Sequence, residues 1–130
     1  MSTFKVDVLQ SRSGGATTFT NQWASKAWVN FDASSGTPTA RSSGNVTSLT
    51  DNGIGDFTAN FTSALASATY TIVGSCSVFS TGAAAATVVE IYDASGGGTN
   101  PTTSATRIYV HRSAVSAVDA SYVCVNILGN

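Results

Sequence analysis

The sequence has few charged residues and no long apolar run. Asp, Glu, Lys and Arg make up 10% of its 130 residues, against roughly 25% in an average globular protein. The net charge of −1 removes the electrostatic basis for nucleic-acid binding, because proteins that bind the phosphate backbone carry clustered Lys and Arg. No run of about 18 apolar residues occurs, so we expect no insertion into a membrane.

Strong helix formers are also scarce. Glu occurs once and Lys twice, which argues against a helical fold. Ser and Thr, in contrast, number 19 and 18, and together with Val, Tyr, Phe and Gly they favour strands and turns. The length fits one domain, so the composition predicts a single, nearly neutral, all-β domain.

The chain has two cysteines, and its amino terminus lacks the basic start and apolar stretch of a signal peptide. We therefore expect folding in a cytoplasm. Cys76 and Cys124 both lie in apolar, strand-like runs, which favours two buried reduced thiols. A disulfide between them stays open as the alternative. No metal-ligand spacing accompanies them, so no metal site is predicted.

Alternation of apolar and polar residues predicts about seven or eight strands and no long helix. The expected fold is an antiparallel β-sandwich or a jelly-roll-like arrangement. A helical turn is possible at 22–26, and residues 32–44 are expected to be mostly loop because they contain a Ser-Ser-Gly-Thr-Pro run. The strands are expected near residues 3–9, 27–31, 45–50, 56–62, 69–79, 87–93, 106–112 and 121–128.

The clearest local pattern is a β-hairpin around Asp51-Asn-Gly-Ile-Gly55. Asn and Gly tolerate the positive φ angles of tight turns. After the turn, Phe57, Ala59 and Phe61 fall on one face of the strand. The two glycines of this turn predict a loop longer than two residues.

Catalysis is not expected. The single histidine, His111, stands in a predicted strand without a recognisable nucleophile. Asp51, Asp56 and Asp93 occupy turn or strand-end positions, where aspartate commonly bonds to its local backbone. The sequence therefore predicts a protein that is not an enzyme and that has no cofactor.

Aromatic side chains are the better candidates for binding. Tyr92 and Tyr109 flank the glycine-rich loop 94–105, and we expect Arg107 and Arg112 to share the face of Tyr109. We interpret these four residues as a candidate receptor-binding set, because aromatic rings and guanidinium groups can contact sugars or carboxylates. Five aromatic residues could either bind sugars or fill the core, and most of them are expected in the core: Trp23, Trp28, Tyr92, Tyr109 and Tyr122.

Two segments resemble a recurrent module of bacteriophage tail-fibre and virion-appendage proteins. They are Lys26-Ala-Trp-Val-Asn-Phe31 and the hairpin from Asn45 to Thr62, followed by an apolar strand that begins near Tyr70. The start, Ser2-Thr-Phe-Lys-Val-Asp7, is similar to that of small marine phage structural proteins. The resemblance covers residues 1–10 and 22–79. Where family members often carry Met-Pro before the Tyr, this chain has Ala64-Leu-Ala66.

The resemblance implies a non-enzymatic, trimeric virion protein, assembled in the host cytoplasm. We expect it at the tip of a tail fibre or appendage, in contact with other virion proteins and with a glycan or protein of the host surface. A capsid decoration protein is the alternative, favoured by the absence of a fibre shaft. Apolar residues on both faces of one strand, such as Ile72 and Val73, are compatible with an oligomer interface.

The amino-terminal segment is predicted to be an attachment arm. Phe4, Val6 and Val8 alternate with polar residues before the flexible Gly14-Gly15 pair, so a tethered strand could pair with a neighbouring sheet. An ordinary first strand of the same sandwich stays open as the alternative. We divide the chain into an arm with its linker at 1–19 and a β-sandwich head at 20–130.

Overall fold

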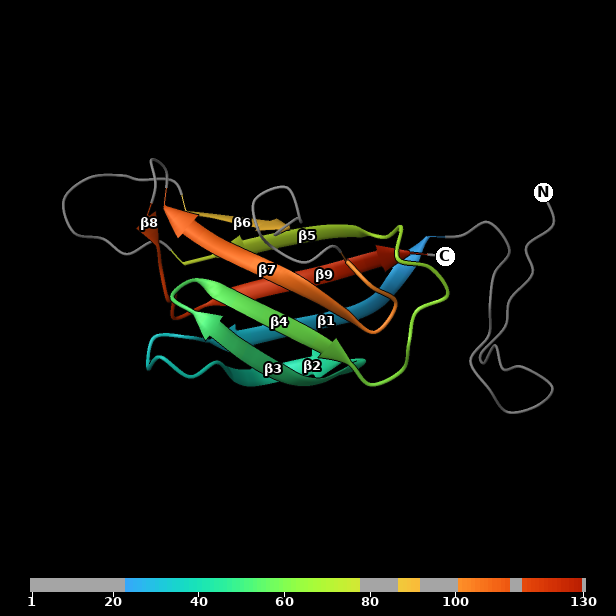
Figure 1. Ribbon diagram of the computed structural model, residues 1–130, viewed down its shortest axis with the longest axis horizontal. Helices are drawn as coiled ribbons and strands as arrows, with labels where there is room; N and C mark the ends of the chain where they lie inside the picture. The colour runs from blue at the N-terminus through green and yellow to red at the C-terminus, as the bar shows by residue number, and fades with distance from the viewer. Residues whose placement is uncertain (1–22, 78–86, 92–100, 113–115, 130) are drawn as a thin grey trace, which may run out of the picture.

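The computed structural model describes residues 23–77, 87–91, 101–112 and 116–129. Within these segments every regular element is a strand, and the strands form two antiparallel sheets. Figure 1 shows the strands of one sheet passing across those of the other, as in a β-sandwich. The predicted all-β sandwich is therefore confirmed. The predicted arm with Phe4, Val6 and Val8 lies outside the described residues.

The two sheets have different strand orders. Sheet A has the order β2 (Thr39–Gly44), β1 (Ala24–Asp32), β9 (Val123–Gly129) and β5 (Thr71–Cys76). Sheet B has the order β3 (Val46–Gly53), β4 (Asp56–Phe61), β7 (Ala105–Arg112) and β6 (Thr87–Ile91), and the short β8 (Ser116–Ala117) also pairs with β7. The first and last described strands, β1 and β9, thus form the centre of sheet A.

The core lies between the sheets and follows the period-2 alternation of the strands. Sheet A contributes every second residue of β1 and β9, and sheet B does the same from β4 and β7. Phe31 and Phe57 meet edge to face across the core, with ring centroids 5.2 Å apart. The fully buried apolar residues include Ala27, Val29, Phe31, Phe57, Ala59, Ile108, Val110, Val123 and Ile127.

The expectation that residues 32–44 are mostly loop is wrong for their second half. β2 covers Thr39–Gly44 and pairs with β1 as an edge strand. Its residues are Ser, Thr, Ala, Arg and Gly, and all but the last are exposed. An edge strand that is exposed on both faces has no apolar alternation for the sequence to reveal. The helical turn expected as possible at 22–26 is wrong as well, because β1 begins at Ala24.

The hairpin between β3 and β4 is confirmed, but its loop is shorter than predicted. Gly53 pairs with Asp56, so only Ile54 and Gly55 form the loop. The register shifts between Asp51 and Gly53, and this irregularity absorbs the first glycine into the strand. Both glycines have positive φ angles, +136° at Gly53 and +66° at Gly55.

A sharp corner carries the chain from sheet A to sheet B. Asn45 stands between β2 and β3 with a φ of 55°. Its side-chain amide donates to the carbonyl oxygens of Lys26 (3.0 Å) and Ser63 (3.1 Å), and its Oδ1 accepts from the Ser63 N–H (2.8 Å). Asparagine suits the corner because it tolerates this φ and because its side chain satisfies the neighbouring backbone.

Candidate binding site

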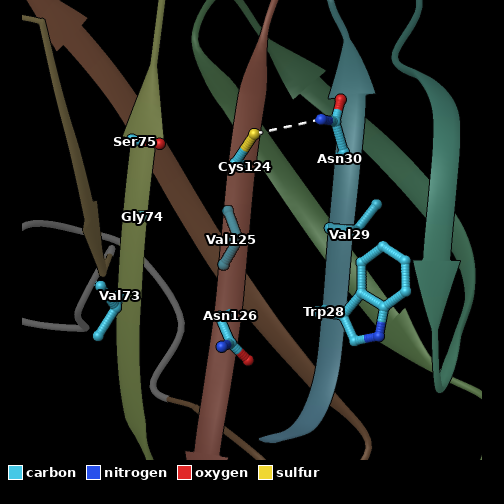
Figure 2. A pocket seen from close by; sticks show the side chains of 9 residues that line it. All are labelled: Trp28, Val29, Asn30, Val73, Gly74, Ser75, Cys124, Val125 and Asn126. Atoms are coloured by element: carbon cyan, nitrogen blue, oxygen red, sulfur yellow. Dashed lines mark hydrogen bonds between the residues drawn. The ribbon is translucent and has the colours of Figure 1, made fainter.

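The outer face of sheet A carries an open groove of about 460 Å³. The groove runs along β9, with β1 on one side and β5 on the other (Figure 2). None of its lining residues is charged. They are Trp28, Val29, Asn30, Val73, Gly74, Ser75, Cys124, Val125 and Asn126.

Strand register explains which side chains share the groove. Trp28 and Val73 both lie opposite Asn126, one on each side of it. Because neighbouring strands are about 4.8 Å apart, the strands that carry these two side chains are roughly 10 Å apart. The next row along the strands consists of Asn30, Cys124 and Ser75. In the first row, the groove is therefore bordered on both sides by apolar side chains. The second row consists of an amide, a thiol and a hydroxyl side chain.

Trp28 is held in place by a glycine on the neighbouring strand. A Cβ atom at Gly44 would lie 2.3 Å from the Trp28 Nε1 and 2.9 Å from its Cδ1. The pyrrole side of the indole thus lies directly on the Gly44 backbone. Even so, 41% of the Trp28 residue surface remains exposed. The ring is therefore fixed on one side and open to solvent on the other.

The polar groups of the groove are only partly occupied. The Asn30 Nδ2 donates to the Cys124 Sγ (3.3 Å), and the Ser25 hydroxyl donates to the Asn126 Oδ1 (2.6 Å). Among the described residues, the Asn126 Nδ2, the Ser75 hydroxyl and the buried Asn30 Oδ1 have no hydrogen-bond partner. One amide donor and one hydroxyl are thus available to a ligand.

The charges of β2 and of the end of β1 neutralise each other outside the groove. Arg41 pairs with Asp32 (2.6 Å), and its guanidinium lies 4.0 Å above the Tyr122 ring. Hydrogen bonds from the Ser34 hydroxyl and backbone N–H lower the pKa of Asp32, and Arg41 adds to the shift. Asp32 therefore stays ionised at neutral pH and keeps Arg41 paired.

Two of the four predicted receptor-binding residues, Arg107 and Tyr109, lie on the other sheet. Arg107 and Tyr109 face outward on β7, where Arg107 binds both carboxylate oxygens of Asp56. Tyr109 lies beside His111 with ring centroids 5.5 Å apart, and His111 is 3.1 Å from Glu90. Arg107 and Tyr109 are thus brought together, but within a network of ion pairs on sheet B.

The other two members of that set are not placed. Tyr92 lies outside the described residues, and Arg112 is described only by its backbone at the end of β7.

The expectation that most aromatic residues are buried is wrong for three of them: Trp23, Trp28 and Tyr122 are 56%, 41% and 54% exposed. Sequence reasoning missed the Trp28 groove, although Trp28 alternates with the core residues Ala27 and Val29, and this alternation places it outward.

The two cysteines are free thiols on opposite faces of sheet A. Cys76 packs against the core, while Cys124 lines the groove. They are not joined by a disulfide, which agrees with the reduced thiols favoured from the sequence. Burial raises the pKa of Cys76, and the nearby Cys124 adds to the shift.

This difference predicts selective alkylation. At mildly alkaline pH, iodoacetamide is expected to modify Cys124 several-fold faster than Cys76, because a raised pKa lowers the thiolate fraction of Cys76 and the core covers it. Peptide mass spectrometry over a time course measures both rates in one sample. Equal rates, or a faster reaction of Cys76, would contradict the placement of the two thiols.

Gly44→Ala is expected to displace the Trp28 indole and leave the fold intact. The new methyl group would overlap the ring, which can rotate away because it is a side chain at the surface, so the cost in stability is about 1 kcal/mol or less. In a Trp23→Phe background Trp28 is the only tryptophan of the chain, and acrylamide quenching of tryptophan fluorescence should rise. Unchanged quenching would show that Gly44 does not position the indole.

No group of three or more His, Cys, Asp or Glu side chains is close enough to hold a metal ion in the described segments. The same segments contain no helix long and apolar enough to cross a membrane.

Compared with family models, with curated proteins and with solved structures, the chain has no match. The features that bear on its function are the groove on sheet A, the Arg107–Asp56 pair on sheet B and the motifs of the sequence.

Proposed function

We propose that the chain is a non-enzymatic binding domain of a virion appendage or tail-fibre tip, and that it contacts the host surface through the groove of sheet A. The observation that carries this proposal is the open, uncharged groove beside the exposed Trp28. A concave site with an aromatic wall and a few unpaired polar groups is the usual form of a ligand site. The virion context is supported by the resemblance of residues 22–79 to appendage modules.

The ionisable groups of sheet B support a binding role over a catalytic one. Asp56 is bound by Arg107, and Glu90 is paired with His111. Arg107 neutralises the Asp56 carboxylate, His111 contacts the Glu90 carboxylate, and their strands place all four residues on the sheet opposite to the groove. We therefore assign the groove to binding and the sheet B network to stability.

Cell binding tests the proposal with two matched variants. Fluorescently labelled protein should bind host cells and reduce adsorption of the phage. Ser75→Lys puts a long charged side chain into the groove and should abolish both effects. Thr47→Lys makes the same kind of change at an exposed position of β3 on sheet B, and it should retain them. Wild-type protein that neither binds cells nor slows adsorption would overturn the host-surface role.

Copy number and mass test the virion assignment. An appendage protein is expected in tens of copies per particle or fewer, and quantitative mass spectrometry of purified virions gives the number. Hundreds of copies would instead indicate capsid decoration.

We also propose a homotrimer, on the basis of the family resemblance and closed cyclic symmetry. Light scattering should then give three times the chain mass of 13.2 kDa, and a monomer would contradict the trimer.

A further inference from the structure

We infer that the groove of sheet A binds a neutral saccharide, with one sugar ring stacked on Trp28 and its hydroxyls bound by Asn126 and Ser75. This inference rests on the proposed function and names the chemical class of its ligand. It depends on three features of the groove: its lack of charge, its fixed aromatic wall and its unpaired polar groups. Each feature independently restricts the chemical class of the ligand.

The lack of charge excludes ligands that are recognised by ion pairing. None of the lining residues is ionic, and Arg41 on the neighbouring β2 is engaged by Asp32 and Tyr122. An anionic ligand such as a phosphate or an acidic glycan needs Arg, Lys or several converging N–H donors. The groove presents amides and hydroxyls, which match the hydroxyls of an uncharged sugar.

The aromatic wall matches the apolar face of a sugar ring. A hexose exposes a patch of C–H groups on one face, and such a patch packs on the flat surface of an indole. Trp28 is fixed by Gly44, so little conformational entropy is lost on binding. Val73 stands on the opposite side and is 56% exposed. The spacing of roughly 10 Å between the two strands that carry these residues leaves room for one sugar chain along β9.

The polar groups of the groove can orient a bound saccharide through hydrogen bonds. The Asn126 Oδ1 already accepts from Ser25, so its Nδ2 can donate to a ligand hydroxyl. The Ser75 hydroxyl has no partner among the described residues and can donate or accept. An apolar ligand would leave these groups unpaired. The combination of one ring platform with the unpaired groups of Asn126 and Ser75 therefore favours a polyol.

Two exposed tryptophans provide a matched pair of variants. Trp28 lines the groove, whereas Trp23 precedes β1 and does not line it. Isothermal titration calorimetry with neutral oligosaccharides released from the host surface polysaccharide should show binding to the wild type. Trp28→Ala should weaken this binding by about tenfold or more. Trp23→Ala should leave it unchanged, and Trp28→Tyr, which keeps an aromatic face, should restore part of it.

Two further readouts locate the ligand. The oligosaccharide should protect Cys124 from iodoacetamide and leave the Cys76 rate unchanged, because only Cys124 lines the groove. Binding of the wild type to host cells should be nearly the same at low and high salt, because a neutral ligand makes no screened charge contact. A strong decrease with salt would identify an anionic ligand and overturn the inference.

Treatment of the cells separates failure of this inference from failure of the proposed function. Periodate, which cleaves vicinal diols of sugars, should abolish binding of the wild type to host cells, and proteinase K should not. Binding that survives periodate and is lost with proteinase K would identify a protein receptor; the host-surface role would stand and the saccharide would be excluded. A change of oligomeric mass in Trp28→Ala, without loss of saccharide binding, would assign the groove to contact between copies of the chain.

Discussion

Gly55→Ala is expected to destabilise the domain by about 3 kcal/mol or more, because the substitution adds overpacking to backbone strain. A Cβ atom at Gly55 would lie 2.3 Å from the carbonyl oxygen of Val110 and 2.7 Å from the backbone nitrogen of Val118. Both are main-chain atoms of ordered segments and cannot rotate away. The same residue accepts a hydrogen bond from the Val110 N–H (2.7 Å) and donates one to the Asp119 carboxylate (2.8 Å).

Gly36 provides a matched control for this substitution. Its φ of +78° is close to the +66° of Gly55, but no atom lies within 4 Å of its Cβ position. Gly36→Ala therefore carries only the cost of a left-handed backbone, about 1 kcal/mol. Urea unfolding followed by circular dichroism measures both variants. Equal losses in the two variants would show that the contact of the hairpin loop with Val110 and Val118 contributes nothing.

The fold class and the core could be predicted from the sequence, since both follow from local alternation. The alternation in β1 places Ala27, Val29 and Phe31 on one face, and the structure buries all three. Phe57 and Ala59 follow the same rule on β4. A period of two determines which residues of a strand point inward, whatever the strand's partners are.

The edges and the loop lengths could not be predicted in the same way. β2 is polar on both faces and becomes a strand only through its pairing with β1. The two-residue loop at Ile54 depends on a register irregularity before Gly53, which is a property of the strand pair. Local propensity does not report such tertiary pairing.

Only part of the candidate site could be predicted from the sequence. Trp28 and Asn30 must share the outer face of β1 once Ala27 and Val29 are assigned to the core. That Asn126 and Ser75 join them depends on the order β1, β9, β5, and these strands are far apart in the sequence, at 24–32, 123–129 and 71–76. The small residue at Gly44, on which Trp28 rests, carries no signal because it stands in a stretch whose composition is typical of loops.

Asp56→Ala is expected to cost about 2–4 kcal/mol, because it leaves the Arg107 guanidinium partly buried without its main partner. The Arg107 Nε donates to the Asp56 Oδ1 at 2.7 Å, and Asn52 donates to the same oxygen at 3.3 Å. The two charged side chains are only 23% and 12% exposed, for Arg107 and Asp56 respectively. Solvent screening is correspondingly weak, so the pair should couple more strongly than a surface pair.

A double-mutant cycle separates this coupling from other effects of the substitutions. Asp56→Ala, Arg107→Ala and the double variant should give a coupling energy of about 1–3 kcal/mol by urea unfolding. The Asp32–Arg41 pair on sheet A is the control, because its side chains are 34% and 33% exposed and exposed pairs contribute about 1 kcal/mol or less. If the two cycles give the same coupling, burial does not strengthen the Asp56 pair, and the sheet B network loses its proposed stabilising role.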